Sequence, residues 1–338
     1  MKVLIGVDPH NATHTAVAID GDETKLRELK VRATKNQCDE LLAWAEVFPD
    51  RRWAVESAAG LGYLLSQQLV AAGETVVDVP PTLSARVRVL GSGKSSKNDP
   101  NDALATAVAA LRGRRLREVT ADDHAVICRM LGDRHHQLTA LRTQAVCRLH
   151  AQLGNLIPGG LSGALTPARA VTLLRAVRPV DGVVAERKQQ AVDLVGDVRR
   201  LDRDVAAIKA RVKVAVAASD TSLLDVYGIG PVVAALIIGH AGDVTRFASR
   251  HHFASYNGTA PIEASSGPKK RHRLNPRGNR TLNHALHIIA VCQIRYDTPG
   301  RAYYLRKIDE GKTKKEALRA LKRRVSDAVY RQLVVDAG

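Results

Sequence analysis

Cysteine is scarce in this chain, and its spacing excludes two classes of small stabilised domain. The four cysteines, Cys38, Cys128, Cys147 and Cys292, stand far apart in 338 residues. Zinc sites use closely spaced ligand pairs, and disulfide frameworks crowd many cysteines into a short chain. Neither a zinc knuckle nor a disulfide framework is indicated, so we expect a protein of the reducing cytoplasm.

Long apolar runs are missing as well. The N-terminal run from Met1 reaches Asp8 after too few residues for a signal peptide. The longest later run, Val232 to Gly239, is far shorter than the ~20 residues that a membrane helix needs. We therefore expect a soluble protein that is not exported and has no membrane partner.

Acidic residues are rare in the C-terminal third, and this leaves a strong local charge. From Ser265 to Arg324, seventeen Lys and Arg stand against four Asp and Glu, whereas from Met1 to Asp102 twelve stand against fourteen. Most of the formal net charge of +17 thus lies in one stretch. Such a surplus releases counterions when it meets a polyanion, so we expect nucleic acid as the partner. A merely solvated basic face is the alternative.

The first 115 residues have the strand and helix order of an α/β domain. Strands are predicted at 3–8, 15–19, 25–33, 53–56 and 75–79, and helices at 38–47, 61–72 and 99–111. No Gly-rich phosphate loop follows the first strand, which argues against a dinucleotide-binding fold. The order favours a ribonuclease-H-like (RuvC-like) domain at 1–115.

The remaining residues are predicted to be mostly helical. Apolar residues recur every three or four positions in 122–156 and 192–212, which indicates two long amphipathic helices in a region spanning 116–217. Pro and Gly residues between Pro158 and Pro167 break the chain, so these helices fold back as an antiparallel coiled-coil pair or pair with another subunit. Helices rich in Arg and Lys are expected at 279–296, 301–310 and 314–335 in a C-terminal domain at 218–338.

A glycine turn lies near the start of that C-terminal domain. Gly228 and Gly230 flank Ile229 between two helical patterns, which is typical of a helix-hairpin-helix. The backbone N–H groups of such a turn can face a phosphate. A plain packing corner between two helices is the alternative.

Four acidic residues form a candidate metal site. Asp8 and Glu56 end two predicted strands, and Asp99 and Asp102 stand three apart at the start of a helix. Carboxylate oxygens at such ends suit Mg²⁺, with Mn²⁺ as a substitute. Asp99 and Asp102 also fit an ordinary helix N-terminus, so the metal interpretation depends on all four acids occurring together. The nearby His10 and His14 could serve as further ligands, but we interpret them as surface or turn residues.

A loop with two serines begins the basic stretch. Ser265 and Ser266 precede Gly267 and a set of cations, Lys269, Lys270, Arg271, Arg273, Arg277 and Arg280. A serine attacks a phosphate only when its proton is removed and the developing charge is stabilised, and these cations could supply the second requirement. A turn that merely touches phosphate is the alternative.

Taken in order, these motifs resemble the DEDD transposases of bacterial insertion sequences, relatives of the Piv-type DNA invertases. The resemblance covers nearly the whole chain and rests on the four acids, the 97–103 and 227–231 segments, the 253–261 stretch, and Ser266-Gly267 followed by Arg273 and the 276–280 segment. One departure is Pro268, which stands where the family usually has a second glycine. Proline fixes φ and lacks an N–H, so it could change which serine faces the phosphate.

The resemblance implies a DNA recombinase of an insertion sequence, with a RuvC-like domain, a coiled-coil insertion and a C-terminal transposase domain. The four acids would hold Mg²⁺, and Ser266, or Ser265 in its place, would form a covalent link to the cut DNA. It also implies an element-encoded guide RNA and a homo-oligomer, from dimer to tetramer. The rival hypotheses are a Holliday-junction-type metal-dependent nuclease that uses water, and a catalytically inactive nucleic-acid-binding protein.

Overall fold

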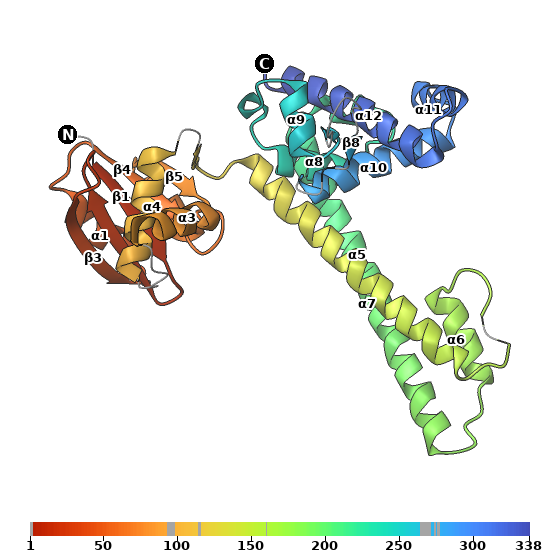
Figure 1. The fold of residues 1–338 in the computed structure, drawn as a ribbon. Coiled ribbons are helices and arrows are strands. Elements are labelled where there is room, and N and C mark those ends of the chain that lie inside the picture. The colour runs from red at the N-terminus through yellow and green to blue at the C-terminus, as the bar shows by residue number, and fades with distance from the viewer. Residues whose placement is uncertain are drawn as a thin grey trace. The chain divides into compact units, whose positions relative to one another are not determined.

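The computed structural model describes residues 3–92, 99–113, 116–159, 161–263, 272–273, 275 and 278–338, which belong to two compact units, 1–122 and 123–338. Figure 1 shows a mixed α/β unit at the N-terminus and a helical unit at the C-terminus. Each unit is considered by itself. The three domains with limits at 115 and 217 stay a prediction.

A single mixed sheet organises the N-terminal unit. Its strands lie in the order β3-β2-β1-β4-β5-β6, in which β1, β4 and β5 run parallel and β2 and β6 antiparallel to their neighbours. The strands are β1 Val3–Pro9, β2 Thr13–Ile19, β3 Lys25–Arg32, β4 Arg51–Glu56, β5 Val76–Val79 and β6 Arg117–Glu118. This is the order of a ribonuclease-H-like domain, and the predicted fold is confirmed.

Both faces of this sheet are covered, which is why every residue of β1 is buried. On one face, Ile5 and Val7 pack with α1 (Gln37–Ala45) and α2 (Tyr63–Ala71). On the other, Leu4 packs against α4 (Asp99–Arg112), beside α3 (Pro81–Ser92). Helix α3 was not predicted from the sequence; its signal is Pro81 at the first helical position, where proline is well tolerated.

Helix α4 approaches β1 very closely at Gly6. A Cβ atom added to Gly6 would lie 2.5 Å from the backbone nitrogen of Ala107, and closer still to the carbonyl oxygen of Ala103. Real Cβ atoms essentially never come this close to a backbone atom. The depth at which α4 sits on the sheet therefore depends on the absence of a side chain at this position.

His14 lies inside the N-terminal unit, so its interpretation as a surface or turn residue is wrong. The side chain is 4% exposed on β2, and its Nε2 is 2.9 Å from Oε1 of Gln37. Burial lowers the pKa of His14, which keeps the ring neutral. Every residue of β2 from His14 to Ile19 is buried because both faces of the sheet are covered, and no alternation of polar and apolar residues in the sequence marks this.

The C-terminal unit is built from helices and one short two-stranded ladder. These are α5 His124–Gly154, α6 Pro167–Ala176, α7 Gly182–Ala217, η1 Ser222–Asp225, α8 Pro231–Ala241, η2 Val244–Arg246, α9 Arg250–Tyr256, β7 Ile262–Glu263, β8 His272–Arg273, α10 Arg280–Arg295, α11 Pro299–Asp309 and α12 Lys314–Asp336. The three predicted basic helices correspond to α10, α11 and α12. Among the described residues no helix combines the length and apolar character that crossing a bilayer requires.

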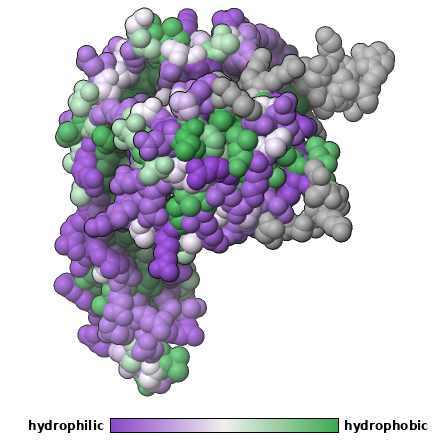
Figure 2. Space-filling model, turned by 90° about the vertical axis from the view of Figure 1, so that its left-hand side faces the viewer, coloured by the Kyte–Doolittle hydropathy of each residue, from purple (hydrophilic) through white to green (hydrophobic). Residues whose placement is uncertain are grey.

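Helices α5 and α7 pack against each other within the chain, in opposite directions (Figure 1). Leu138 and Ala145 of α5 share a core with Leu201 and Ile208 of α7. Each helix buries only one stripe, and the surface of the pair is largely hydrophilic (Figure 2). The two long amphipathic helices are confirmed, whereas the finer coiled-coil geometry stays a prediction.

Helix α6 begins at Pro167, the last of the residues that were expected only to break the chain. Thr166 caps it by accepting a hydrogen bond from the Arg169 N–H, and Pro167 occupies its first helical position. Proline there removes a donor that has no intrahelical partner, so it begins a helix rather than ending one. Leu174 then packs against Leu149 and Leu153 at the far end of α5.

Replacing Gly6 by alanine is expected to destabilise the protein by about 1–3 kcal/mol, because the added methyl group overpacks a backbone contact. Gly21→Ala is the matched control, since a Cβ there meets nothing within 4 Å. Urea unfolding followed by circular dichroism measures both. Equal stability of the two variants would contradict the close approach of α4.

His14 also predicts a pH dependence. Its lowered pKa means that the unfolded chain binds a proton more readily than the folded one. The free energy of unfolding should therefore fall as the pH drops below about 6.5, the ordinary histidine pKa. In His14→Gln this fall should be smaller than in wild type when urea unfolding is compared at pH 7.5 and pH 5.5. The same fall in both proteins would exclude His14 as its source.

Candidate metal centre

Two of the four candidate acids share one face of the sheet. Strands β1 and β4 are parallel with Val7 opposite Val55, so the next residues, Asp8 and Glu56, reach the same strand end. Side chains alternate along a strand, so Asp8 points to the face of Leu4 and Gly6, which α4 covers. Both carboxylates thus stand at the carboxyl edge of the sheet, on the side of α4.

Helix α4 adds the other two acids at that edge. It starts at Asp99, and Asp102 lies in its first turn, where a negative charge is favoured by the helix dipole. Asp102 immediately precedes Ala103, whose carbonyl lies against Gly6 of β1. The close packing at Gly6 therefore carries the acidic start of α4 to the ends of β1 and β4.

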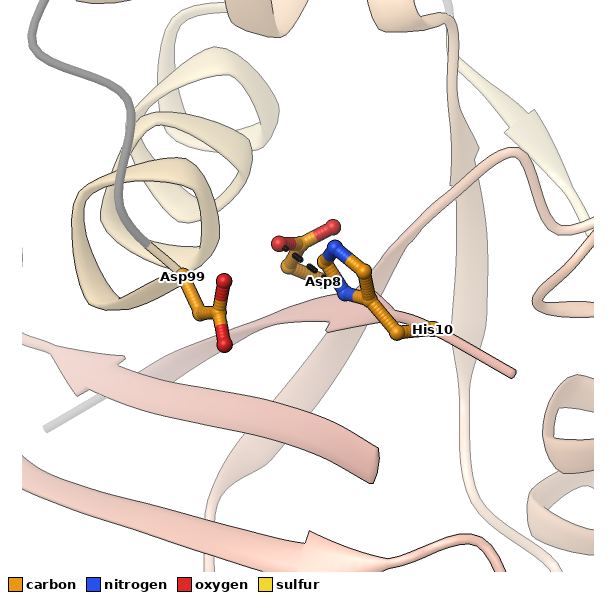
Figure 3. A group of neighbouring side chains, drawn as sticks. All are labelled: Asp8, His10 and Asp99. Atoms are coloured by element: carbon orange, nitrogen blue, oxygen red, sulfur yellow. Dashed lines mark ion pairs between the residues drawn. The ribbon is translucent and has the colours of Figure 1, made fainter. Parts of the chain in front are cut away.

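In the described part of the chain, one group of acidic and histidine side chains could hold a metal ion, and it consists of Asp8, His10 and Asp99. Each offers one ligand atom, and these atoms lie within 4.8 Å of one another (Figure 3). The Nδ1 atom of His10 is 3.4 Å from Oδ2 of Asp8. Asp8 is buried, His10 exposed and Asp99 of intermediate exposure, so the group opens toward solvent.

His10 is a residue that the sequence interpretation considered as a ligand but did not select. It is exposed, as expected of a surface histidine, but its ring belongs to the acidic group. The available signal was its position two residues after Asp8, on the same side of an extended chain.

Glu56 and Asp102 are not members of that group, although α4 joins them. The buried hydroxyl of Thr106 lies 3.3 Å from Oε2 of Glu56 and 2.9 Å from the carbonyl oxygen of Asp102. Its single proton is shared between these two acceptors. Thr106 therefore fixes the distance between α4 and the end of β4.

Two basic side chains neutralise the acids of α4. Lys30 on β3 places its Nζ 2.7 Å from Oδ2 of Asp99, and this hydrogen bond lowers the pKa of Asp99. Arg88 on α3 forms an ion pair with Oδ1 of Asp102, whose side chain is only 6% exposed. Neither cation was singled out in the sequence, because both lie far from the acids along the chain.

The glycine turn is only partly as predicted. Gly228 adopts a φ of +93°, and a Cβ there would lie 3.3 Å from both Cys292 and the carbonyl oxygen of Ile289 in α10. Gly230 is the N-cap of α8 and faces open space. The element before the turn is the one-turn helix η1 rather than an α-helix, so a helix-hairpin-helix is not confirmed.

The serine loop is described only at its base. Ser265, Ser266, Lys269, Lys270, Arg271 and Arg277 lie outside the described residues. The backbone of Arg273 pairs with Ile262 in the β7–β8 ladder, and Arg280 is exposed at the start of α10.

A buried polar network holds the chain just before this ladder. The Asn257 side chain, fully buried, donates to Ser326 Oγ at 2.8 Å and accepts from the Thr259 hydroxyl at 2.7 Å. Asn283 donates to the Asn257 carbonyl and accepts from Lys322. Because satisfied buried networks are rigid, this one fixes the turn that leads into the serine loop.

Comparison with known proteins identifies the family. Residues 5–158 match a family model described as a transposase of the DEDD, IS110 type, and residues 220–305 match one described as "Transposase IS116/IS110/IS902 family". The chain is 28% identical to the "Insertion element IS116 uncharacterized 44.8 kDa protein" of Streptomyces clavuligerus, over 98% of this chain and 94% of that protein. It is also 28% identical to the "Insertion element IS900 uncharacterized 42 kDa protein" of Mycobacterium paratuberculosis, over 98% and 95%.

Among solved structures, the chain is similar to Thermus thermophilus RuvC in complex with a Holliday junction substrate. The identity is 17%, the match covers 35% of this chain and 100% of that one, and the TM-score is 0.28. The strand order, not this score, is the basis for the fold assignment. The first family match covers the N-terminal unit and continues into the C-terminal one, and the second lies within the C-terminal unit. The chain belongs to the IS110/IS116/IS902 family of insertion-sequence transposases, enzymes that transfer phosphoryl groups in DNA.

Proposed function

We propose that this transposase cuts and rejoins DNA by a serine attack that is assisted by Mg²⁺ held by Asp8, Glu56, Asp99 and Asp102. The observation that carries the proposal is the convergence of Asp8 and Asp99 from different elements, with ligand atoms of both inside one 4.8 Å group. The DEDD family implies a divalent metal, and the acids of this edge are the residues that would hold it.

The donor set fits such an ion. Carboxylate oxygens are the ligands that Mg²⁺ prefers, and the partly open group leaves room for waters and phosphate oxygens. The imidazole of His10 is a softer donor that suits Mn²⁺ better than Mg²⁺. When bound, the metal would stabilise negative charge on the attacked phosphate and on the leaving oxygen.

The nucleophile in this proposal is Ser266, with Ser265 in its place as the alternative. As its Oγ–P bond forms, one P–O bond of the DNA backbone breaks, the serine proton passes to a base and the leaving oxygen takes up a proton. Reversal with a different DNA hydroxyl rejoins the strand. The network around Asn257 supports this role, because it holds the loop's entry rigidly in place.

The cations of the C-terminal unit would bind the DNA backbone in the same scheme. These are Lys269, Lys270, Arg271, Arg273, Arg277 and Arg280, with the turn at Gly228 and Gly230 as a further phosphate contact. The open space around Gly230 supports that contact.

The guide RNA and the assembly extend the proposal by resemblance to the family. An element-encoded RNA would select donor and target DNA, and the protein would read its shape through backbone contacts. The acids and the serine would come from different subunits of a dimer or tetramer, held together in part through α5 and α7 as a coiled coil.

Metal binding tests the acids. Mn²⁺ at about one hundred times its Kd should stabilise the wild type by about 2.7 kcal/mol, seen as a rise in melting temperature. Asp8→Asn, nearly the same size, should lose this rise. Asp39→Asn is the control, because it removes an exposed carboxylate of α1 in the same unit. Equal rises in all three proteins would favour the inactive, binding-only alternative.

Covalent capture of DNA tests the serine. Wild type incubated with labelled element-end DNA should give a protein-DNA adduct that survives denaturing electrophoresis. Ser266→Ala should reduce it by roughly 10³-fold or more, as removal of a nucleophile does in other enzymes, and Ser265→Ala should retain it. If the adduct persists in the double variant, the serine mechanism is wrong. Free DNA ends with unmodified serine would instead indicate a nuclease that uses water.

A further inference from the structure

Arg88 is the counter-charge of a buried carboxylate. The Asp102 side chain is 6% exposed, and Arg88, itself 23% exposed, forms an ion pair with its Oδ1. Leaving one charge of such a pair alone in the interior is strongly destabilising. Asp102 therefore needs a cation at all times, and in the protein by itself Arg88 supplies it.

The second ion pair of α4 differs in its surroundings. The side chains of Lys30 and Asp99 are 54% and 36% exposed. Exposed pairs contribute little to stability, because water already solvates both charges. Comparing Lys30 with Arg88 therefore tests whether burial of the ion pair is what gives Arg88 its role.

The backbone that carries Arg88 is fixed, although its side chain is long. Ser84, one turn earlier on α3, is buried and lies 3.2 Å from the Thr106 hydroxyl of α4. Thr106 likewise lies one turn from Asp102 on α4. Ser84 and Arg88 of α3 are therefore spaced like Thr106 and Asp102 of α4, which they face. Arg88 can change its partner by a side-chain rotation while the Ser84 contact holds α3 in place.

A metal at the four acids competes with Arg88 for Asp102. An ion bound there supplies the counter-charge that the carboxylate needs, and the guanidinium then lies beside a second cation, which weakens its pairing with Asp102. The anion that reaches this edge together with the metal is the phosphate of the DNA strand. Guanidinium binds phosphate through two parallel hydrogen bonds, a geometry that a lysine ammonium cannot copy.

We propose that Arg88 is a phosphate-binding residue of the metal centre, which pairs with Asp102 in the free protein and passes to a backbone phosphate of bound duplex DNA when metal occupies Asp102. This inference rests on the proposed metal-binding function. Its consequence is that metal and DNA strengthen each other's binding, since each takes one partner of the same ion pair, and such coupling is reciprocal.

The test measures the Mn²⁺ affinity by isothermal titration, with and without a short mixed-sequence DNA duplex. In wild type the duplex should tighten Mn²⁺ binding by about tenfold, within the range of typical coupling energies. Arg88→Gln keeps a hydrogen-bonding side chain but removes the charge. Without DNA it should bind Mn²⁺ about tenfold more tightly than wild type, the loss of one competing charge being worth about 1.4 kcal/mol. With DNA it should show no further gain.

Three further variants separate the explanations. Lys30→Met and Arg86→Gln, which remove an exposed cation of β3 and of α3, should keep the wild-type effect of DNA on Mn²⁺ binding. Arg88→Lys retains the charge that folding requires but lacks the fork, so its coupling should fall to roughly threefold. If Arg88→Gln does not fold, the coupling measured in Arg88→Lys tests the role of Arg88 instead.

The outcomes are distinguishable. If wild type does not bind Mn²⁺, the proposed metal site itself is wrong. If wild type binds Mn²⁺ but the DNA effect is unchanged in both Arg88 variants, the role of Arg88 is wrong while the metal site stands. Weaker Mn²⁺ binding by Arg88→Gln in the absence of DNA would also overturn it, since Arg88 would then only hold Asp102 in position.

Discussion

The contact between α4 and β1 at Gly6 is the constraint on which the candidate centre depends. An added Cβ would run into the backbone of α4, so only glycine lets the helix lie this deep on the sheet. Asp8 stands two residues after Gly6, and Asp102 stands immediately before the helical residue that touches Gly6. The absence of a side chain at Gly6 thus allows the C-terminal end of β1 and the start of α4 to lie close together.

Carboxylates that lie this close together repel one another, and the surrounding elements offset this repulsion in different ways. Arg88 compensates Asp102 inside the unit, Lys30 compensates Asp99 at the surface, and the Thr106 hydroxyl lies beside Glu56. Such compensation permits the fold to form before any metal is present. If the proposed centre binds a metal, the ion must displace these partners from the acids.

In the C-terminal unit, buried polar side chains are compensated mainly by hydrogen bonds rather than by ion pairs. Its basic stretch emerges from a core in which Asn257, Asn283, Ser326 and Lys322 satisfy one another. Such a rigid base would suit the serine attack proposed above, because a nucleophile is effective only when held in position. The family matches extend over both units.

The sequence alone determined the positions along the chain of five of the six strands of the N-terminal sheet, the two long helices, the basic C-terminal helices and the four acids as candidates, because each of these follows from local periodicity or from charge. Tertiary structure decided the rest. His10 joined the acidic group and His14 became buried through the pairing of β1 with β2, and Arg88 and Lys30 reached the acids from elements 14 and 69 residues away. Such partners leave no local pattern in the sequence, because the packing of α3, α4 and β3 around one sheet edge is what brings them together. A contact between elements that are distant in the chain produces no periodicity.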